Sequence, residues 1–344
     1  MIINTAHVSF NARDFDGMLR FYCGTLGLKR KFTLTYGDLA AFSRANRATS
    51  WIPPAEFETT VGGFETLREV PWLTYLEIAD HQFLEIFNPV GGTADAPVVE
   101  GCYGYQKIAL EVGDAVAKFA ELTAKGVVPK TEVRVTADHA FAFNLDDPEG
   151  NHLEIVQFTA RSPQVAGSGV VPDGTAFRHT AQTAFQTKDM PAALRFYCDG
   201  LGLEHAFTMT YGDLARAIRS SVDPAAAPDP RRDAMLAQLE PRSADSWIEF
   251  LRTGEHQFLE LFHVNDEKQV VDSYRQAYGY LHFCLEVDDI RATRAFVERN
   301  GIVPDTATSL GLDGSWQFWV HDPDGNRIEF MQYTESSMQT RRTT

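Results

Sequence analysis

The sequence has few cysteines, no long apolar run and no basic stretch, and each absence makes a class of protein less likely. None of the four cysteines (Cys23, Cys102, Cys198 and Cys284) is in a CxxC spacing, so we expect reduced core residues rather than disulfides or metal ligands. The N-terminal segment lacks the basic-then-apolar pattern of a signal peptide, and no apolar run approaches membrane-spanning length. With 31 basic and 47 acidic residues, the net charge of −16 argues against nucleic acid or an anionic membrane as a partner. We therefore expect a soluble, acidic, cytoplasmic protein.

Several familiar catalytic motifs are also missing. The chain contains no GxSxG nucleophile motif, no phosphate-binding loop and no dinucleotide-binding fingerprint. The segment DPDG at 322–325 superficially resembles a calcium loop, but its glycine is misplaced and the bidentate glutamate is absent. Its proline and glycine instead predict a hairpin turn.

The chain consists of two halves that repeat each other at a constant step. The segment LRFYC at 19–23 recurs at 194–198, a step of 175 positions. The same step relates YGDL at 36–39 to 211–214, HQFLE at 81–85 to 256–260, and DP at 147–148 to 322–323. A constant step indicates duplication without net insertion, so we divide the chain into halves 1–159 and 177–335, a Gly- and Pro-containing linker 160–176, and a tail 336–344.

Each half divides again into two modules of one pattern, which gives modules 1–90, 103–159, 177–265 and 279–335. In the first module a strand at 7–10 precedes a helix that Asp14 caps and Gly27 ends. Three further strands are predicted at 32–43, 72–78 and 82–87. The pattern predicts an α+β fold in which four βαβββ modules form two cup-shaped mixed sheets. Inserts at 44–70 and 219–245, the second with a short helix near 231–239, are either lids or tolerated loops.

Every module places two polar residues on the strand face opposite its apolar residues. Side chains alternate along a strand, so His7 lies opposite Val8, and Glu329 lies opposite Ile328 and Phe330. The four first-strand residues are His7, Lys107, Gln182 and His282, and the four last-strand residues are Glu85, Glu154, Glu260 and Glu329.

This arrangement suits a divalent metal ion. A lone strand glutamate usually faces solvent, and a lone strand histidine is more often a hydrogen-bonded residue than a ligand. Four equivalent glutamates, combined with imidazoles, favour a site for one divalent ion such as Zn, Ni, Fe, Mn or Co.

The module plan, together with the segments HVSF, LRFYCGTLGL, QFLEIF, YLHFCLEVDDI and DPDGNRIEFMQ, resembles the vicinal oxygen chelate superfamily. That superfamily includes glyoxalase I, extradiol dioxygenases, methylmalonyl-CoA epimerase and the fosfomycin and bleomycin resistance proteins. The resemblance covers both halves except the two inserts. It implies that two modules close a cup around one metal ion, which first-strand and last-strand residues hold.

Two pairings of the modules are open. If neighbours pair, the second half supplies Gln182, Glu260, His282 and Glu329. If pairing is crossed, modules one and four supply His7, Glu85, His282 and Glu329, while Lys107, whose ammonium cannot ligate a metal, joins Glu154, Gln182 and Glu260. Two residues, Lys107 and Gln182, depart from a His-Glu-His-Glu set, and crossed pairing places both of them in the same cup. We therefore predict His7, Glu85, His282 and Glu329 as the metal ligands.

The resemblance to glyoxalase I implies a metal-dependent isomerase or lyase, similar to lactoylglutathione lyase. The metal would hold two adjacent oxygens of a small hydroxycarbonyl substrate and stabilise an enediolate, while Glu329 would carry the proton between carbons. Glutathione as part of the substrate stays open. Two alternatives are a non-haem Fe(II) dioxygenase that uses His7, His282 and Glu329, and a non-catalytic binding protein of the drug-resistance kind. Four modules in one chain complete both cups without a dimer, although a homodimer stays open.

Overall fold

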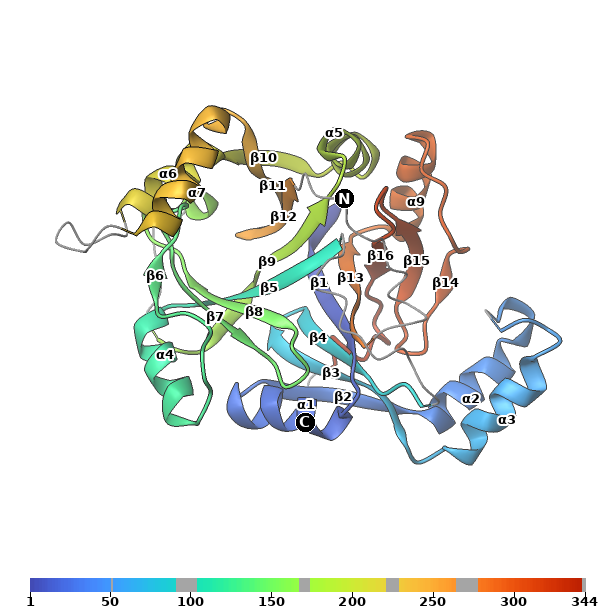
Figure 1. Ribbon diagram of the computed structural model, residues 1–344. Helices are drawn as coiled ribbons and strands as arrows, with labels where there is room; N and C mark the ends of the chain where they lie inside the picture. Colours follow the sequence, from blue (N-terminus) through green and yellow to red (C-terminus); the bar gives the residue numbers. More distant parts are fainter. Residues whose placement is uncertain (51, 91–103, 167–173, 221–228, 264–277, 342–344) are drawn as a thin grey trace.

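The computed structural model describes all residues except 51, 91–103, 167–173, 221–228, 264–277 and 342–344, and it contains two eight-stranded mixed sheets (Figure 1). The first sheet has the strand order β14-β15-β16-β13-β1-β4-β3-β2, and the second has β10-β11-β12-β9-β5-β8-β7-β6. Each sheet therefore combines the strands of two modules, as the predicted α+β fold of four modules requires. No helix among the described residues has the length and apolar character that crossing a bilayer demands.

The first sheet is built from modules one and four. Module one supplies β1 (Ile2–Asn11), β2 (Lys29–Thr35), β3 (Pro71–Ala79) and β4 (Gln82–Phe87), with α1 (Phe15–Leu19), the π-helix Arg20–Thr25, α2 (Tyr36–Ala45), the 3-10 helix Arg47–Thr49 and α3 (Phe57–Thr66). Module four supplies β13 (Gly279–Val287), α9 (Ile290–Arg299), β14 (Ser309–Leu310), β15 (Trp316–His321) and β16 (Arg327–Gln332).

The second sheet is built from modules two and three. Module two supplies β5 (Gly104–Val112), α4 (Ala115–Ala124), β6 (Arg134–Val135), β7 (Phe141–Asp146) and β8 (His152–Gln157), followed by the 3-10 helix Pro163–Val165. Module three supplies β9 (Phe177–Thr187), α5 (Met190–Leu194), the π-helix Arg195–Gly200, β10 (Glu204–Thr210), α6 (Tyr211–Ser220), α7 (Pro230–Leu239), the 3-10 helix Glu240–Arg242, β11 (Ser246–Gly254) and β12 (Gln257–His263).

The first helix of every module begins at an aspartate whose side chain accepts a backbone N–H of the first turn. Asp14 accepts the N–H of Gly17, as predicted, and Asp114, Asp189 and Asp289 do the same in the other modules. An N-cap carboxylate satisfies donors that the helix leaves open and favours the positive end of its dipole. The modules therefore repeat in local structure as well as in sequence.

One predicted strand is wrong in its second half. The strand expected at 32–43 ends at Thr35, and helix α2 takes over from Tyr36. The physical reason is a capping box, in which Thr35 and Asp38 each bind the other's backbone N–H. Part of the insert 44–70 forms α3, whereas the short helix predicted near 231–239 is confirmed as α7.

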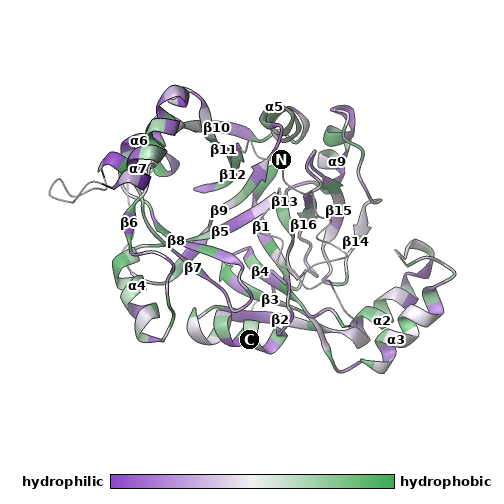
Figure 2. Cartoon of the chain, viewed as in Figure 1, coloured by the Kyte–Doolittle hydropathy of each residue, from purple (hydrophilic) through white to green (hydrophobic). Residues whose placement is uncertain are grey.

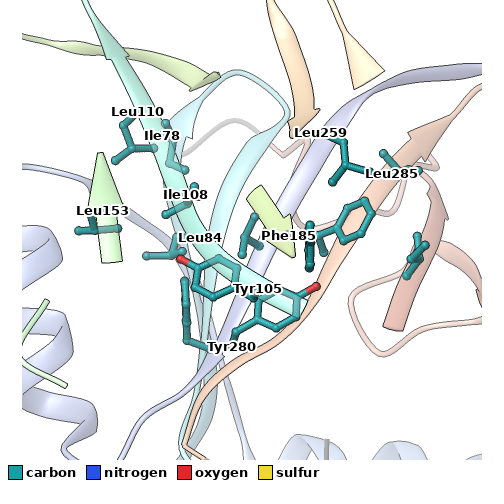
Figure 3. Close-up of a cluster of buried hydrophobic side chains, with 14 of the residues drawn as sticks. Ile78, Leu84, Tyr105, Ile108, Leu110, Leu153, Phe185, Leu259, Tyr280 and Leu285 are labelled. Atoms are coloured by element: carbon teal, nitrogen blue, oxygen red, sulfur yellow. The ribbon is translucent and has the colours of Figure 1, made fainter. Parts of the chain in front are cut away.

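The two sheets share one hydrophobic core. Figure 3 shows Leu84 and Leu285 of the first sheet in the same cluster as Ile108 and Phe185 of the second. The rings of Tyr105 and Tyr280 stack there, with centroids 4.6 Å apart and planes 3° from parallel. Outside this core, helices such as α6 and α7 mix hydrophilic and hydrophobic residues along their length (Figure 2). The polar strand residues lie on the faces turned away from this core.

Candidate metal centre

Crossed pairing of the modules builds the site. The central strands β1 and β13 run antiparallel and place His7 opposite Cys284, and Ser9 opposite His282. On the outer side of each central strand a parallel neighbour adds a glutamate, because Ser9 pairs with Glu85 and Cys284 pairs with Glu329. We call the face of the first sheet that carries His7, Glu85, His282 and Glu329 the first cup.

The four predicted ligands of the first cup converge on one point. The two imidazole Nε2 atoms of His7 and His282 are 3.1 Å apart. Oε2 of Glu329 lies 3.1 Å from His7 Nε2 and 3.6 Å from His282 Nε2. Oε2 of Glu85 lies 3.6 Å and 3.3 Å from the same two nitrogens. All four side chains are buried.

These spacings match those of ligand atoms around one metal ion. With metal–ligand bonds of about 2.1 Å, neighbouring ligand atoms are about 3.0 Å apart in an octahedral site and about 3.4 Å apart in a tetrahedral one. Among the residues that the structure describes, two groups of possible ligands have ligand atoms within 4.8 Å of one another, namely His7 with Glu85 and His282, and His7 with Cys284 and Glu329. The donor set therefore fits a divalent ion with nitrogen and oxygen ligands.

The charges of the first cup also favour a bound metal ion. Burial alone would raise the pKa of Glu329, but contacts with His282 and His7 outweigh it and lower that pKa to about 2. Burial would lower the pKa of His282, yet Glu329 and Glu85 raise it overall. The Glu329 carboxylate thus stays ionised and needs positive charge beside it, which a metal ion would supply.

Two side chains next to the predicted ligands were not proposed from the sequence. Ser9 donates a hydrogen bond to Oε2 of Glu85, and its Oγ lies 2.9 Å from Nε2 of His282. Cys284, expected to be only a core residue, is buried and also belongs to a group of possible ligands. Strand alternation signalled both, because Ser9 shares a face with His7, and Cys284 shares one with His282.

The hydrogen bonding of the second ring nitrogen, Nδ1, in both histidines differs from that of a typical metal-bound histidine. A metal-bound imidazole usually donates its second N–H to an acceptor. Nδ1 of His7 and Nδ1 of His282 are buried without a hydrogen-bond partner among the described residues. The rings are held by packing instead, since Tyr75 contacts His7 edge-on at 5.4 Å and Trp319 contacts His282 at 4.7 Å between centroids.

The second cup, the equivalent face of the second sheet, carries Lys107, Glu154, Gln182 and Glu260. Lys107 stands 175 positions before His282, and its Nζ donates to Glu154 at 2.5 Å. The same Nζ lies 3.3 Å from Oε2 of Glu260. Both glutamates are therefore paired with a built-in ammonium ion.

This ammonium stays charged although it lies among buried groups. Burial would lower the pKa of Lys107, but the charges of Glu154 and Glu260 raise it above its usual range. Burial raises the pKa of Glu260 to about 7, against the lowering effect of Lys107. A protonated amine cannot ligate a metal, so the second cup does not offer a ligand set like that of the first.

Comparison with solved structures shows the same fold in distant relatives. Glyoxalase I from Zea mays is 14% identical, with a TM-score of 0.55 over 96% of this chain and 92% of that chain. A Bacillus subtilis protein named only as a dioxygenase candidate is 13% identical, with a TM-score of 0.54 over 96% of this chain and 85% of that chain. At these identities the likeness shows the fold alone. No curated protein matches the sequence significantly.

A family model matches both halves of the sequence. The Glyoxalase/Bleomycin resistance protein/Dioxygenase superfamily model covers residues 4–155 and 178–330. Each matched segment contains two modules, in agreement with the repeat of 175 positions. With its module plan, crossed sheets and two cups, the chain belongs to the glyoxalase/bleomycin resistance protein/dioxygenase superfamily.

Proposed function

We propose that this protein is a divalent-metal-dependent isomerase or lyase, glyoxalase I-like, that acts on a small hydroxycarbonyl substrate in the first cup. The observation that carries the proposal is the convergence of His7, Glu85, His282 and Glu329 on one point with spacings of 3.1 to 3.6 Å. These four side chains would hold the ion. When bound, the ion supplies positive charge that favours adjacent substrate oxygens as they become anionic.

The two carboxylates of the first cup differ in their surroundings. Glu85 accepts a hydrogen bond from Ser9, which fixes its orientation. Glu329 has no hydroxyl donor among the described residues, and it forms ion pairs with His7 and His282. Glu329 is therefore the less constrained carboxylate, and we assign it the task of moving a proton between neighbouring substrate carbons.

Aromatic side chains lie beside these groups. Phe32 stacks on Tyr75 with centroids 4.6 Å apart, and Phe87 contacts the His282 ring at 6.3 Å. Such walls exclude water from a reacting carbon and leave the polar atoms as the groups that orient a substrate. They favour a compact substrate that combines an apolar part with adjacent oxygens.

Solvent proton exchange tests the proposal directly. The metal-loaded protein is incubated in D₂O with a panel of α-hydroxyketones and of hemithioacetals formed from 2-oxoaldehydes and thiols. We expect one class to gain deuterium at the carbon beside the carbonyl, detected by NMR, and to be converted to product. Glu329→Gln should reduce exchange by about 100-fold or more, within the range expected for a lost acid–base group.

The alternatives give different results in the same assays. Oxygen consumption with catechols but no deuterium exchange would make the protein a dioxygenase. Saturable binding with neither exchange nor oxygen consumption would make it a binding protein. Either result would overturn the isomerase or lyase proposal.

A further inference from the structure

The second cup contains a pocket of about 410 Å³. Lys107, Glu154, Gln182 and Glu260 form its charged end, which corresponds in sequence to the ligand set of the first cup. Its remaining walls are largely apolar and include Met209, Leu214, Ile218, Trp247, Phe250 and Phe262. Helix α6, beside the β10–β11 edge of the second sheet in Figure 1, supplies part of this apolar wall.

One substitution between the two cups accounts for part of this space. In the first cup Trp319 packs against the His282 ring, with centroids 4.7 Å apart. The residue 175 positions earlier is Asn144, which lines the pocket of the second cup. A smaller side chain leaves volume where the first cup is filled by an indole. Asn144 also lines an adjoining pocket of about 410 Å³ that shares Lys107 and Phe262.

The charged end of the pocket holds acceptors that lack donors. Oε1 of Gln182 and Oε2 of Glu260 are buried without a hydrogen-bond partner among the described residues. Nζ of Lys107 lies 3.3 Å from the second of these atoms, as an ion-pair partner that this atom shares with Glu154. Buried acceptors without donors are costly, so a ligand with N–H groups would gain by supplying them.

The charges that line the pocket favour a cation. Its side chains include two basic groups, Lys107 and Arg134, and three acidic groups, Asp138, Glu154 and Glu260. Lys107 binds Glu154, and Arg134 lies 3.8 Å from the other oxygen of the same carboxylate. Glu154 therefore has two basic neighbours, whereas Glu260 has one ion pair among the described residues, with the same Lys107. An anionic head group would meet an excess of negative charge here.

We propose that the second cup is a metal-independent binding site for a small organic amine with an apolar body. The ammonium group would donate to Glu260 and Gln182, and the apolar body would lie against Trp247 and Phe250. This site goes beyond the proposed reaction in the first cup and does not depend on a metal there. It gives a role to a cup whose Lys107 departs from the metal-ligating pattern.

Calorimetric titration of the metal-loaded, full-length protein tests the proposal with two probes of matched shape. These are 2-phenylethylamine and 3-phenylpropionate, which share the apolar body and differ in the charge of the head group. We expect one amine to bind per chain, at least tenfold more tightly than the acid. Equal affinities, tighter binding of the acid, or no binding of the amine at millimolar concentration would overturn the proposal.

Three variants locate the binding. Gln182→Leu removes an acceptor, and Ala217→Trp fills the pocket from helix α6 without touching the charged end. Each should weaken amine binding at least tenfold, while an unchanged metal content shows that the first cup remains intact. His282→Ala should leave amine binding unchanged, so a failure of the first-cup proposal is distinguishable from a failure of this one. Amine binding that persists in both Gln182→Leu and Ala217→Trp, or that His282→Ala abolishes, would overturn the second-cup site.

Discussion

At the scale of single residues, the two cups show how one side chain changes the chemistry of a shared frame. His282 and Lys107 occupy equivalent positions between two buried glutamates. An imidazole leaves a lone pair for a metal, whereas the lysine brings its own positive charge. The glutamates need a cation in both cups, and the two residues meet that need in different ways.

Ser9 is expected to position a ligand rather than to bind the metal. It donates to Glu85, and its loss would free that carboxylate to turn. We predict that Ser9→Ala lowers metal affinity about 10- to 100-fold, as removal of such supporting hydrogen bonds does. Competition with a chromogenic chelator measures the change. The reciprocal substitution Ala184→Ser, at the equivalent position of the second cup, should have no effect, and an unchanged affinity in Ser9→Ala would refute the assignment.

Glu260 should make stability depend on pH. Its pKa is about 7 in the folded protein against an ordinary value of 4.5, so the folded state binds more protons between these pH values. Stability therefore falls as the pH rises from 4.5 to 7 and is constant above that window as far as this group is concerned. Glu260→Gln should remove this contribution, about 1–3 kcal/mol across the window. Urea unfolding at several pH values checks it, and parallel pH profiles for wild type and variant would contradict it.

At the scale of elements, most strands and the first helix of each module could be predicted because their signals are local. Alternating apolar residues define β4 at the predicted residues, and Asp14 caps the first helix as expected. The error at 32–43 came from an apolar pattern that runs across the boundary between β2 and α2. The segment TYGD, with Thr35 and Asp38 three positions apart, carried the correct signal for a helix start.

The capping box of helix α2 gives a prediction at this scale. Thr35→Ala removes a hydroxyl that accepts the N–H of Asp38, a change that costs about 1 kcal/mol in other helices. Hydrogen exchange of the amides in α2 should then be about fivefold faster, because local opening becomes easier. Thr35→Ser keeps the hydroxyl and should exchange at nearly the wild-type rate. Equal protection in Thr35→Ala and wild type would show that the cap does not hold the helix.

At the scale of the whole molecule, the sequence favoured crossed pairing but did not require it. All four modules share one plan, so local patterns fit either partner equally well. The choice depends on contacts distant in sequence, such as β1 with β13 and β5 with β9. Within each half, a hydrogen bond between the sheets also connects the two modules. Tyr22 donates to Asp147 in the first half, and Tyr197 donates to Asp322 in the second. These long-range contacts are what the sequence pattern alone could not supply.

Crossed pairing predicts how separated halves behave. Fragments 1–166 and 174–344 each contain half of the first-cup ligands, so neither alone should bind metal in a His-Glu-His-Glu site. Mixing or co-expressing them should restore one tight site per pair of fragments, measured by elemental analysis after gel filtration. A fragment 174–344 that binds one metal by itself would show that Gln182, Glu260, His282 and Glu329 suffice.

Metal content of the full-length protein tests the central claim most directly. We predict one transition metal ion per chain by elemental analysis, lost in His7→Ala and His282→Ala and retained in Gln182→Ala. This pattern assigns the metal to a single site made by modules one and four. Loss in Gln182→Ala with retention in His7→Ala, or a chain that takes up no metal on reconstitution, would contradict the account.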